Sequence, residues 1–305
     1  MRAFNFLAVW LLQVTTAAVA TRLGPVARQE LQAQQSVKDL RSQLSEGAVI
    51  LSPFDPEWTA LLARASYPRL HPNYNIIVEV ATESDVQKTV SYAHKRNIPF
   101  LAVSGGHGWT TSLNKLNGGI QINMRKLNST TVDQGGKTGT VGGGALQWEA
   151  TKALYDAGKQ TVTGLCECVS VIGPLMGGGH SWLQNQHGYS LDNIESARVV
   201  LANGTLVETS NTKNPDLFWA LRGAGHNFGI VTSFQMKLYD VPSTNQWTIY
   251  SFLYKQDKLE ALYNLVNKVD GSKDRPLKLM LTGVFRNDPS LDSKVCEKRF
   301  FDFNS

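Results

Sequence analysis

Cysteine is scarce in this chain, with three residues in 305: Cys166, Cys168 and Cys296. This number is too small for a scaffold held together by disulfides. Because the number is odd, at least one thiol is unpaired, bound to a ligand or linked to another chain. Cys166 and Cys168 are separated by a single residue, which is too tight a spacing for an easy mutual disulfide.

Long apolar runs and blocks of like charge are also lacking. After the first twenty residues, no stretch is both long and apolar enough to cross a bilayer. The net charge of +5 is spread along the chain without a Lys/Arg run, so it gives little support for nucleic acid as a partner. We therefore expect no nucleic-acid partner and no membrane-embedded segment.

Several familiar signatures are missing as well. There is no Gly-x-x-x-x-Gly-Lys-Ser/Thr loop, which excludes that kind of phosphate-binding site. The stretch from Gly223 to Gly229 is near Gly-x-Gly-x-x-Gly, but its last spacing is off by one and it precedes a predicted strand. No paired carboxylates or Ser/His/Asp pattern favours a cell-wall hydrolase. His180, His187 and His226 lack partners at metal-ligand spacing, so no metal is expected.

The N-terminus has the pattern of a targeting segment. A basic residue precedes the apolar run 4–12, and Ala18-Val19-Ala20 fits a small-x-small cleavage site. This pattern predicts a signal peptide over residues 1–20 and a secreted protein, the alternative being a short buried helix. Two glycosylation sequons, at Asn128 and Asn203, fit a secreted chain.

The middle of the chain predicts alternating strands and helices. A strand over 75–81, a helix opened by the capping pair Thr82 and Asp85, and a strand over 99–103 form a βαβ unit. Further predictions are an arm or short helix over 21–50, helices at 52–67, 146–158, 215–223 and 259–269, strands at 119–124, 228–239, 247–254 and 277–285, and hairpins around Gly135-Gly136 and Asn203-Gly204. The rings of Trp148, Trp182 and Trp219 are expected in the core.

The stretch from Val103 to Thr110 organises the candidate site. Its strand stops at Gly105 and Gly106, where the missing Cβ atoms let backbone N–H groups approach an anionic ligand, and His107 follows directly. Two more glycine clusters, 142–144 and 177–179, are interpreted as further walls of the same pocket. The working hypothesis is a covalently held flavin.

Four motifs in order carry a resemblance to a known family. They are Ser104-Gly105-Gly106-His107-Gly108, Gly164-Leu165-Cys166, Gly177-Gly178-Gly179-His180 with Gly188 and Asp192-Asn193, and Asp216 to Gly223 with Phe228 to Val231. Residues 67–241 resemble the FAD-binding domain of the vanillyl-alcohol-oxidase and p-cresol-methylhydroxylase (PCMH) group, in its berberine-bridge-enzyme-like branch. The resemblance implies an α+β fold: a PCMH-type FAD-binding domain of two subdomains over 67–241, an N-terminal arm over 21–66, and the start of an α+β substrate domain over 242–305.

The resemblance also implies roles for single residues. His107 matches the histidine that carries the flavin through its 8α-methyl group; the alternative is a buried histidine at a strand end. The backbone of Ser104 to His107 would cradle the pyrophosphate, and Gly108 is also expected to bind the cofactor. Cys166 matches the attachment point of the flavin C6 atom in members that continue Cys-Pro-Thr, whereas this chain continues Cys-Glu-Cys, and a small buried thiol is the alternative. Residues expected to line the flavin and adenosine are Gly142, Gly143, Gly144, Gly173, Gly178, Gly179 and Ile230.

The implied function is that of a secreted FAD-dependent oxidoreductase. A hydride would pass from an alcohol, sugar or natural product to the flavin, with dioxygen as the electron acceptor. Members of the family are longer than 305 residues, and no catalytic base is identified in this chain, so truncation is expected. The alternative is a truncated flavin-binding or secreted glycoprotein without turnover.

Overall fold

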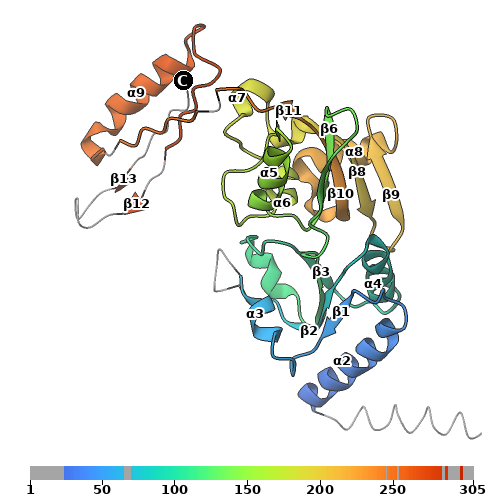
Figure 1. The fold of residues 1–305 in the computed structure, drawn as a ribbon. Helices are drawn as coiled ribbons and strands as arrows, with labels where there is room; N and C mark the ends of the chain where they lie inside the picture. The colour runs from blue at the N-terminus through green and yellow to red at the C-terminus, as the bar shows by residue number, and fades with distance from the viewer. Residues whose placement is uncertain are drawn as a thin grey trace, which may run out of the picture.

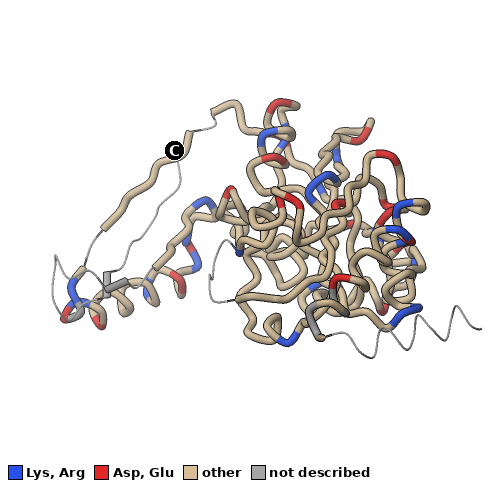
Figure 2. Tube along the Cα trace, turned by 90° about the horizontal axis from the view of Figure 1, so that it is seen from below, with Lys and Arg blue, Asp and Glu red and all other residues tan. Residues whose placement is uncertain are grey.

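Two β-sheets, each with its own helices, form two lobes in the computed structural model of the chain (Figure 1). The structure describes residues 24–64, 70–244, 246–252, 254–283, 286–287 and 296–297. The predicted signal peptide, residues 1–20, lies outside the described residues. Lysine and arginine are interspersed with aspartate and glutamate along the trace (Figure 2).

Lobe 1 is built on a four-stranded sheet in the order β1-β2-β4-β3. Strands β2, β4 and β3 run parallel, and β1 joins the edge antiparallel. The strands are β1 Val49–Leu51, β2 Tyr74–Glu79, β3 Phe100–Val103 and β4 Gly119–Asn123; the helices are α2 Pro25–Arg41, α3 Trp58–Leu62, α4 Glu83–Lys95 and the 3₁₀ turn η1 Thr111–Lys115.

Helix α4 makes the crossover of the predicted βαβ unit. The Thr82 hydroxyl accepts from the Asp85 amide, and the Asp85 carboxylate accepts from the Thr82 amide, so the predicted capping box is confirmed. Val86 and Val90 on its inner face are fully buried against the sheet. The helix ends before Asn97, whose φ of 52° is left-handed.

The N-terminal segment is more ordered than expected. Of the two predicted alternatives, a surface arm or a short helix, the structure has a helix, the 17-residue α2, followed by strand β1, and Leu40 of α2 is fully buried in the core of lobe 1. The helix predicted over 52–67 is confirmed only in the five residues of α3. Residues 65–69 of that prediction lie outside the described residues.

Lobe 2 is built on a five-stranded antiparallel sheet in the order β5-β6-β10-β8-β9. Both predicted hairpins are confirmed as β5–β6 and β8–β9. The strands are β5 Thr130–Val132, β6 Thr138–Gly142, β8 Ile194–Val200, β9 Leu206–Ser210 and β10 Ile230–Lys237, with a separate small pair of β7 Lys159–Gln160 and β11 Tyr239–Asp240. The helices are α5 Gln147–Asp156, α6 Ile172–Leu175, α7 Gln184–His187, α8 Pro215–Ala224, η2 Ser190–Asn193 and η3 Gly225–Asn227.

The core of lobe 2 lies between one face of this sheet and the helices. Phe234 and Met236 of β10 pack there with Phe218 of α8, and all three are buried. The tryptophan predictions are wrong for two residues, because Trp219 is 75% exposed and Trp148 is 49% exposed. Trp182 is half-buried.

Beyond lobe 2 the described chain contains η4 Gln256–Lys258, α9 Leu259–Asp270, β12 Arg286–Asn287 and β13 Cys296–Glu297. The predicted helix is confirmed as α9. The predicted strand over 247–254 is absent from described residues 246–252 and 254, and the one over 277–285 is absent from 277–283. Trp247, Ile249 and Phe252 are about half exposed there. The alternating apolar residues of this segment therefore do not form a buried strand face, and no described strand pairs with them. No helix in the described part of the chain has the length and apolarity needed to cross a membrane.

Candidate functional site

The turn after β3 touches lobe 2 at two places. The Ser104 hydroxyl donates to the Gly144 carbonyl at 3.0 Å. A Cβ placed on Gly105 would lie 2.8 Å from the Ser170 amide nitrogen and 3.0 Å from the Cys168 carbonyl oxygen. The first glycine motif therefore lies against two segments of the other lobe, and only glycine fits at position 105.

The same turn offers backbone donors. Gly105 and Gly106 are half-buried, and Gly106 has a left-handed φ of 70°. Within the described residues, neither amide has a hydrogen-bond acceptor. Successive amides in such a turn form a concave anion-binding nest, and this donor set fits a pyrophosphate. The half-buried His107 follows, and the Gly108 carbonyl accepts from Arg64 Nη2 at 2.7 Å.

The second glycine cluster is wedged between the lobes. The Gly143 amide donates to the Thr232 carbonyl of β10, and the Gly144 amide donates to the Leu127 carbonyl. A Cβ placed on Gly143 would lie 2.1 Å from the Val231 carbonyl oxygen. A Cβ placed on Gly144 would lie 1.8 Å from the Met124 carbonyl oxygen. These contacts leave no room for any side chain.

The segment 166–173 completes the contact with the first turn. Its backbone is hydrogen-bonded to residues 145–147, which follow the second glycine cluster. The Gln147 amide donates to the Val169 carbonyl, and the Val171 amide donates to the Ala145 carbonyl. The Gly173 amide donates to the Ser170 hydroxyl at 3.3 Å. Cys166 is exposed and its thiol is free, so the alternative of a small buried thiol is wrong.

The third cluster reaches this site indirectly. Gly178 and Gly179 have φ values of 123° and 80°, and their carbonyls accept from the amides of Leu191 and Ser190. His226 links the two regions: its Nε2 lies 3.0 Å from the Gly173 carbonyl, and its ring would lie 3.6 Å from a Cβ on Gly177. The contacts thus join the first two glycine clusters directly, and the third through His226.

Neighbouring residues have structural tasks. The Asp192 carboxylate accepts from the Tyr189 amide at 2.8 Å and holds the turn after α7, as predicted. His187 stacks on Tyr239 at 3.6 Å between ring centroids, and burial lowers the pKa of His187. Ile230 is buried at the start of β10, next to Val231 at the second glycine cluster. No group of three His, Cys, Asp or Glu side chains in the described residues could hold a metal ion.

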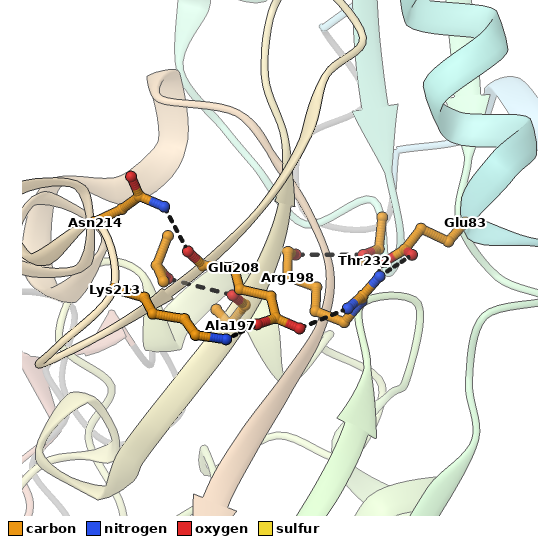
Figure 3. Close-up of polar contacts among 8 residues, drawn as sticks. Glu83, Ala197, Arg198, Glu208, Lys213, Asn214 and Thr232 are labelled. Atoms are coloured by element: carbon orange, nitrogen blue, oxygen red, sulfur yellow. Dashed lines mark hydrogen bonds and ion pairs between the residues drawn. The ribbon is translucent and has the colours of Figure 1, made fainter.

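Sequence reasoning missed the ion pairs that join the lobes. Figure 3 shows Arg198 of β8 reaching Glu83 at the start of α4, with Nε to Oε2 at 2.9 Å and Nη2 to Oε1 at 2.7 Å. The Thr232 hydroxyl donates to Glu83 Oε2 at 2.6 Å, and Arg198 Nη1 also donates to Glu208. The hydrogen bonds from Arg198 outweigh burial and hold the pKa of Glu83 below its usual value. These partners are 115 residues apart, a separation at which sequence periodicity gives no signal.

A second ion pair joins the two lobes near the glycine turns: Arg125, just after β4, binds Glu149 of α5.

A surface depression of about 320 Å³ lies on the outer face of the lobe 2 sheet. It is lined by Arg198, Glu208, Lys213 and other residues, and by none of the expected site residues.

The comparisons with known proteins agree with this geometry. Residues 74–210 match the family model described as FAD binding domain. FAD-linked oxidoreductase OXR2 of Pyricularia oryzae is 39% identical over 272 residues, which cover 88% of this chain and 52% of that protein. The solved structure of xylooligosaccharide oxidase from Myceliophthora thermophila matches with a TM-score of 0.75 at 27% identity, covering 90% of this chain and 56% of that one. BBE-like 1 of Physcomitrella patens matches with a TM-score of 0.72 at 26% identity, covering 88% and 56%.

The two lobes are thus a PCMH-type FAD-binding domain, and FAD is the cofactor of this domain. The chain resembles the berberine-bridge-enzyme-like FAD-linked oxidoreductases, which confirms the family predicted from the four motifs. The chain spans about half the length of the curated relatives it matches.

Proposed function

We propose that this chain acts as an FAD-dependent oxidoreductase on a small molecule. The observation that carries the proposal is the half-buried turn 104–107 at the boundary of the two lobes, where the Gly105 and Gly106 amides have no acceptor among the described residues. Bound FAD would supply the hydride acceptor for a carbon bearing a hydroxyl or amine, with dioxygen as the final electron acceptor and peroxide as the product. The protein binds, orients and encloses the reacting groups.

The residues take separate parts in binding. The amides of Gly105 and Gly106 would hold the pyrophosphate, and His107 would hold the flavin at its 8α-methyl group, where a covalent link would keep it from dissociating. The position of His107 directly after the nest supports this role. Cys166 is the candidate for a second attachment, because its thiol is free and exposed two residues from Cys168, whose carbonyl borders Gly105.

The remaining wall residues fall into two groups by their contacts. Ile230 begins β10, and Gly143, which follows β6, donates its amide to the Thr232 carbonyl of β10. Gly173 lies beside Ser170. Gly178 and Gly179 form the outer part of the wall, connected through His226. Substrates are small molecules with an oxidisable alcohol or amine carbon, such as sugars, alcohols or natural products.

Secretion is part of the proposal, and the sequons allow a finer statement. Asn203 is exposed at the tip of the β8–β9 hairpin, where its side-chain oxygen accepts from the Thr205 amide and its side-chain nitrogen has no acceptor among the described residues. Asn128 is exposed, but its side-chain nitrogen donates to Glu149 Oε1 at 3.2 Å. Glycan transfer needs that nitrogen, so Asn203 is the preferred acceptor of the two for any transfer to the folded chain, and both asparagines are accessible at the surface.

A second candidate is a flavin-binding protein without turnover. It is favoured by the described residues 246–252 and 277–283, which form no strand where a substrate-domain sheet was predicted.

One set of assays separates the candidates. Purified protein is expected to absorb in the flavin bands, to keep its flavin after acid precipitation, and to release it when His107→Ala is made. Peroxide formed with sugars, alcohols or amines supports the oxidoreductase. Yellow protein that yields no peroxide and no reduced flavin with any of them supports the second candidate, and colourless protein that takes up no FAD contradicts both.

A further inference from the structure

We propose that Arg125 is a positioning residue of the FAD site, which holds the second glycine cluster against the first turn. The inference rests on the proposed FAD site between the lobes. It names a residue outside all four sequence motifs and gives it a task that involves no contact with the flavin.

The contacts of Arg125 converge on one carbonyl of that cluster. Arg125 lies in lobe 1, directly beyond β4, and its Nη1 donates to the Gly144 carbonyl. The Ser104 hydroxyl donates to the same carbonyl at 3.0 Å. Gly144 therefore receives two side chains from lobe 1, one of which begins the turn that offers its amides to the pyrophosphate.

Glu149 fixes the direction of the guanidinium. Arg125 Nη1 lies 3.0 Å from Glu149 Oε2 and Nη2 lies 2.7 Å from Oε1, a two-pronged pair in which the side chains are 30% and 15% exposed. Glu149 also accepts from the Leu146 amide at 2.8 Å, at the start of α5. The Glu149 carboxylate thus connects Arg125 to Leu146, two residues after the glycine cluster.

The electrostatics agree with a fixed arrangement. Burial by itself raises the pKa of Glu149, but the hydrogen bonds from Arg125, Leu146 and Asn128 outweigh it and leave the pKa below its usual value. Arginine suits this position because its planar fork can bind a carboxylate with two donors and still reach a carbonyl, which a lysine ammonium cannot do with the same geometry.

Loss of Arg125 has a defined consequence. The Gly144 carbonyl loses one donor, and the Glu149 carboxylate loses its charged partner while it keeps its bonds to Leu146 and Asn128. The turn 142–144 is then held to lobe 1 by the Ser104 hydroxyl bond to the Gly144 carbonyl and by the Gly144 amide bond to Leu127, without the charged guanidinium. Gly144 becomes freer to move away from Ser104, and the Gly105 and Gly106 amides lose their fixed aim.

The test measures FAD affinity in a His107→Ala background, where the proposed covalent link is absent and FAD exchanges. Arg125→Met is compared with Arg125→Lys and with Lys152→Met. The last variant breaks the exposed Lys152–Asp156 pair on the same helix α5, an ion pair of little expected worth. Circular dichroism and thermal melting establish that each variant is folded at the assay temperature.

Arg125→Met is expected to raise the Kd for FAD about tenfold and to shift the flavin absorbance bands, whereas Lys152→Met leaves both unchanged. Arg125→Lys should fall between them, because it restores one donor. Equal Kd values and spectra for the Arg125 variants and Lys152→Met would overturn the inference; if Arg125→Met does not fold, Arg125→Lys alone decides. If even the protein with wild-type Arg125 takes up no FAD, the proposed function itself fails, and the inference with it.

Discussion

Gly144→Ala is the substitution whose effect follows most directly from the structure. The new Cβ would lie 1.8 Å from the Met124 carbonyl oxygen and 2.6 Å from its carbon, more than an ångström inside normal contact. The obstacle is backbone of the other lobe, so no side chain can rotate away. The φ of Gly144 lies outside the left-handed region, and the cost therefore comes from lack of space alone.

The size of the effect can be estimated from overpacking. Extra atoms in a packed interior cost about 1–3 kcal/mol, and a backbone obstacle places Gly144→Ala at the upper end, about 3 kcal/mol. At about 2–4 °C per kcal/mol, the Tm should fall by about 6–12 °C. The movement also separates Gly144 from Ser104, so FAD content should fall with the Tm.

Gly135→Ala is the matched control. It lies in the turn of the β5–β6 hairpin, where a Cβ would meet nothing within 4 Å. It should leave the Tm unchanged or raise stability by up to about 1 kcal/mol, because alanine restricts the unfolded chain. Thermal melting of both variants, with and without FAD, is the assay. Equal Tm values for Gly144→Ala and Gly135→Ala would refute the reasoning that this turn is wedged between the lobes.

Three further predictions follow from other contacts. Glu83→Gln should cost about 1–2 kcal/mol at neutral pH in urea unfolding. Folding lowers the pKa of Glu83 from its usual 4.5, so the wild type has the larger free energy of unfolding above that pH. This difference in free energy should shrink as the pH falls through the lowered pKa. A difference that persists unchanged in acid would contradict the assignment. Cys166→Ser and Cys168→Ser should each remove one thiol that reacts rapidly in folded, flavin-free protein, with stability changed by less than about 0.5 kcal/mol; thiols that react only after unfolding would show that these side chains are buried. Asn203→Gln should remove more of the glycan mass on protein secreted from a eukaryotic host than Asn128→Gln does, and the reverse pattern would overturn the preference for Asn203.

The parts of the fold that the sequence predicts correctly depend on local chemistry. Thr82 and Asp85 cap α4 within four residues, and Asn203-Gly204 closes the β8–β9 hairpin within two. Such signals act over a few bonds, so they survive whatever the rest of the chain does. The three glycine clusters are visible in the sequence for the same reason, because consecutive glycines interrupt the hydrophobic pattern locally.

The parts that were missed depend on distant partners. Strand β10 pairs with both β6 and β8, although the chain between β6 and β8 also forms α5, α6 and α7. Trp219 occupies the outer face of α8, where composition suggested core. Arg125 and Glu149 are 24 residues apart and meet only because two lobes fold against each other. No local sequence pattern predicts a contact of this kind.

The central claim, that the boundary of the two lobes binds FAD with His107 bonded to it, has one direct measurement. Purified protein is precipitated with acid and digested, and the flavin-bearing peptide is identified by mass spectrometry. The account predicts yellow protein with about one FAD per chain, and a flavin mass on the peptide that contains His107. Colourless protein that takes up no added FAD would contradict the account of the site, and flavin attached to a peptide lacking His107 would contradict the assigned bond.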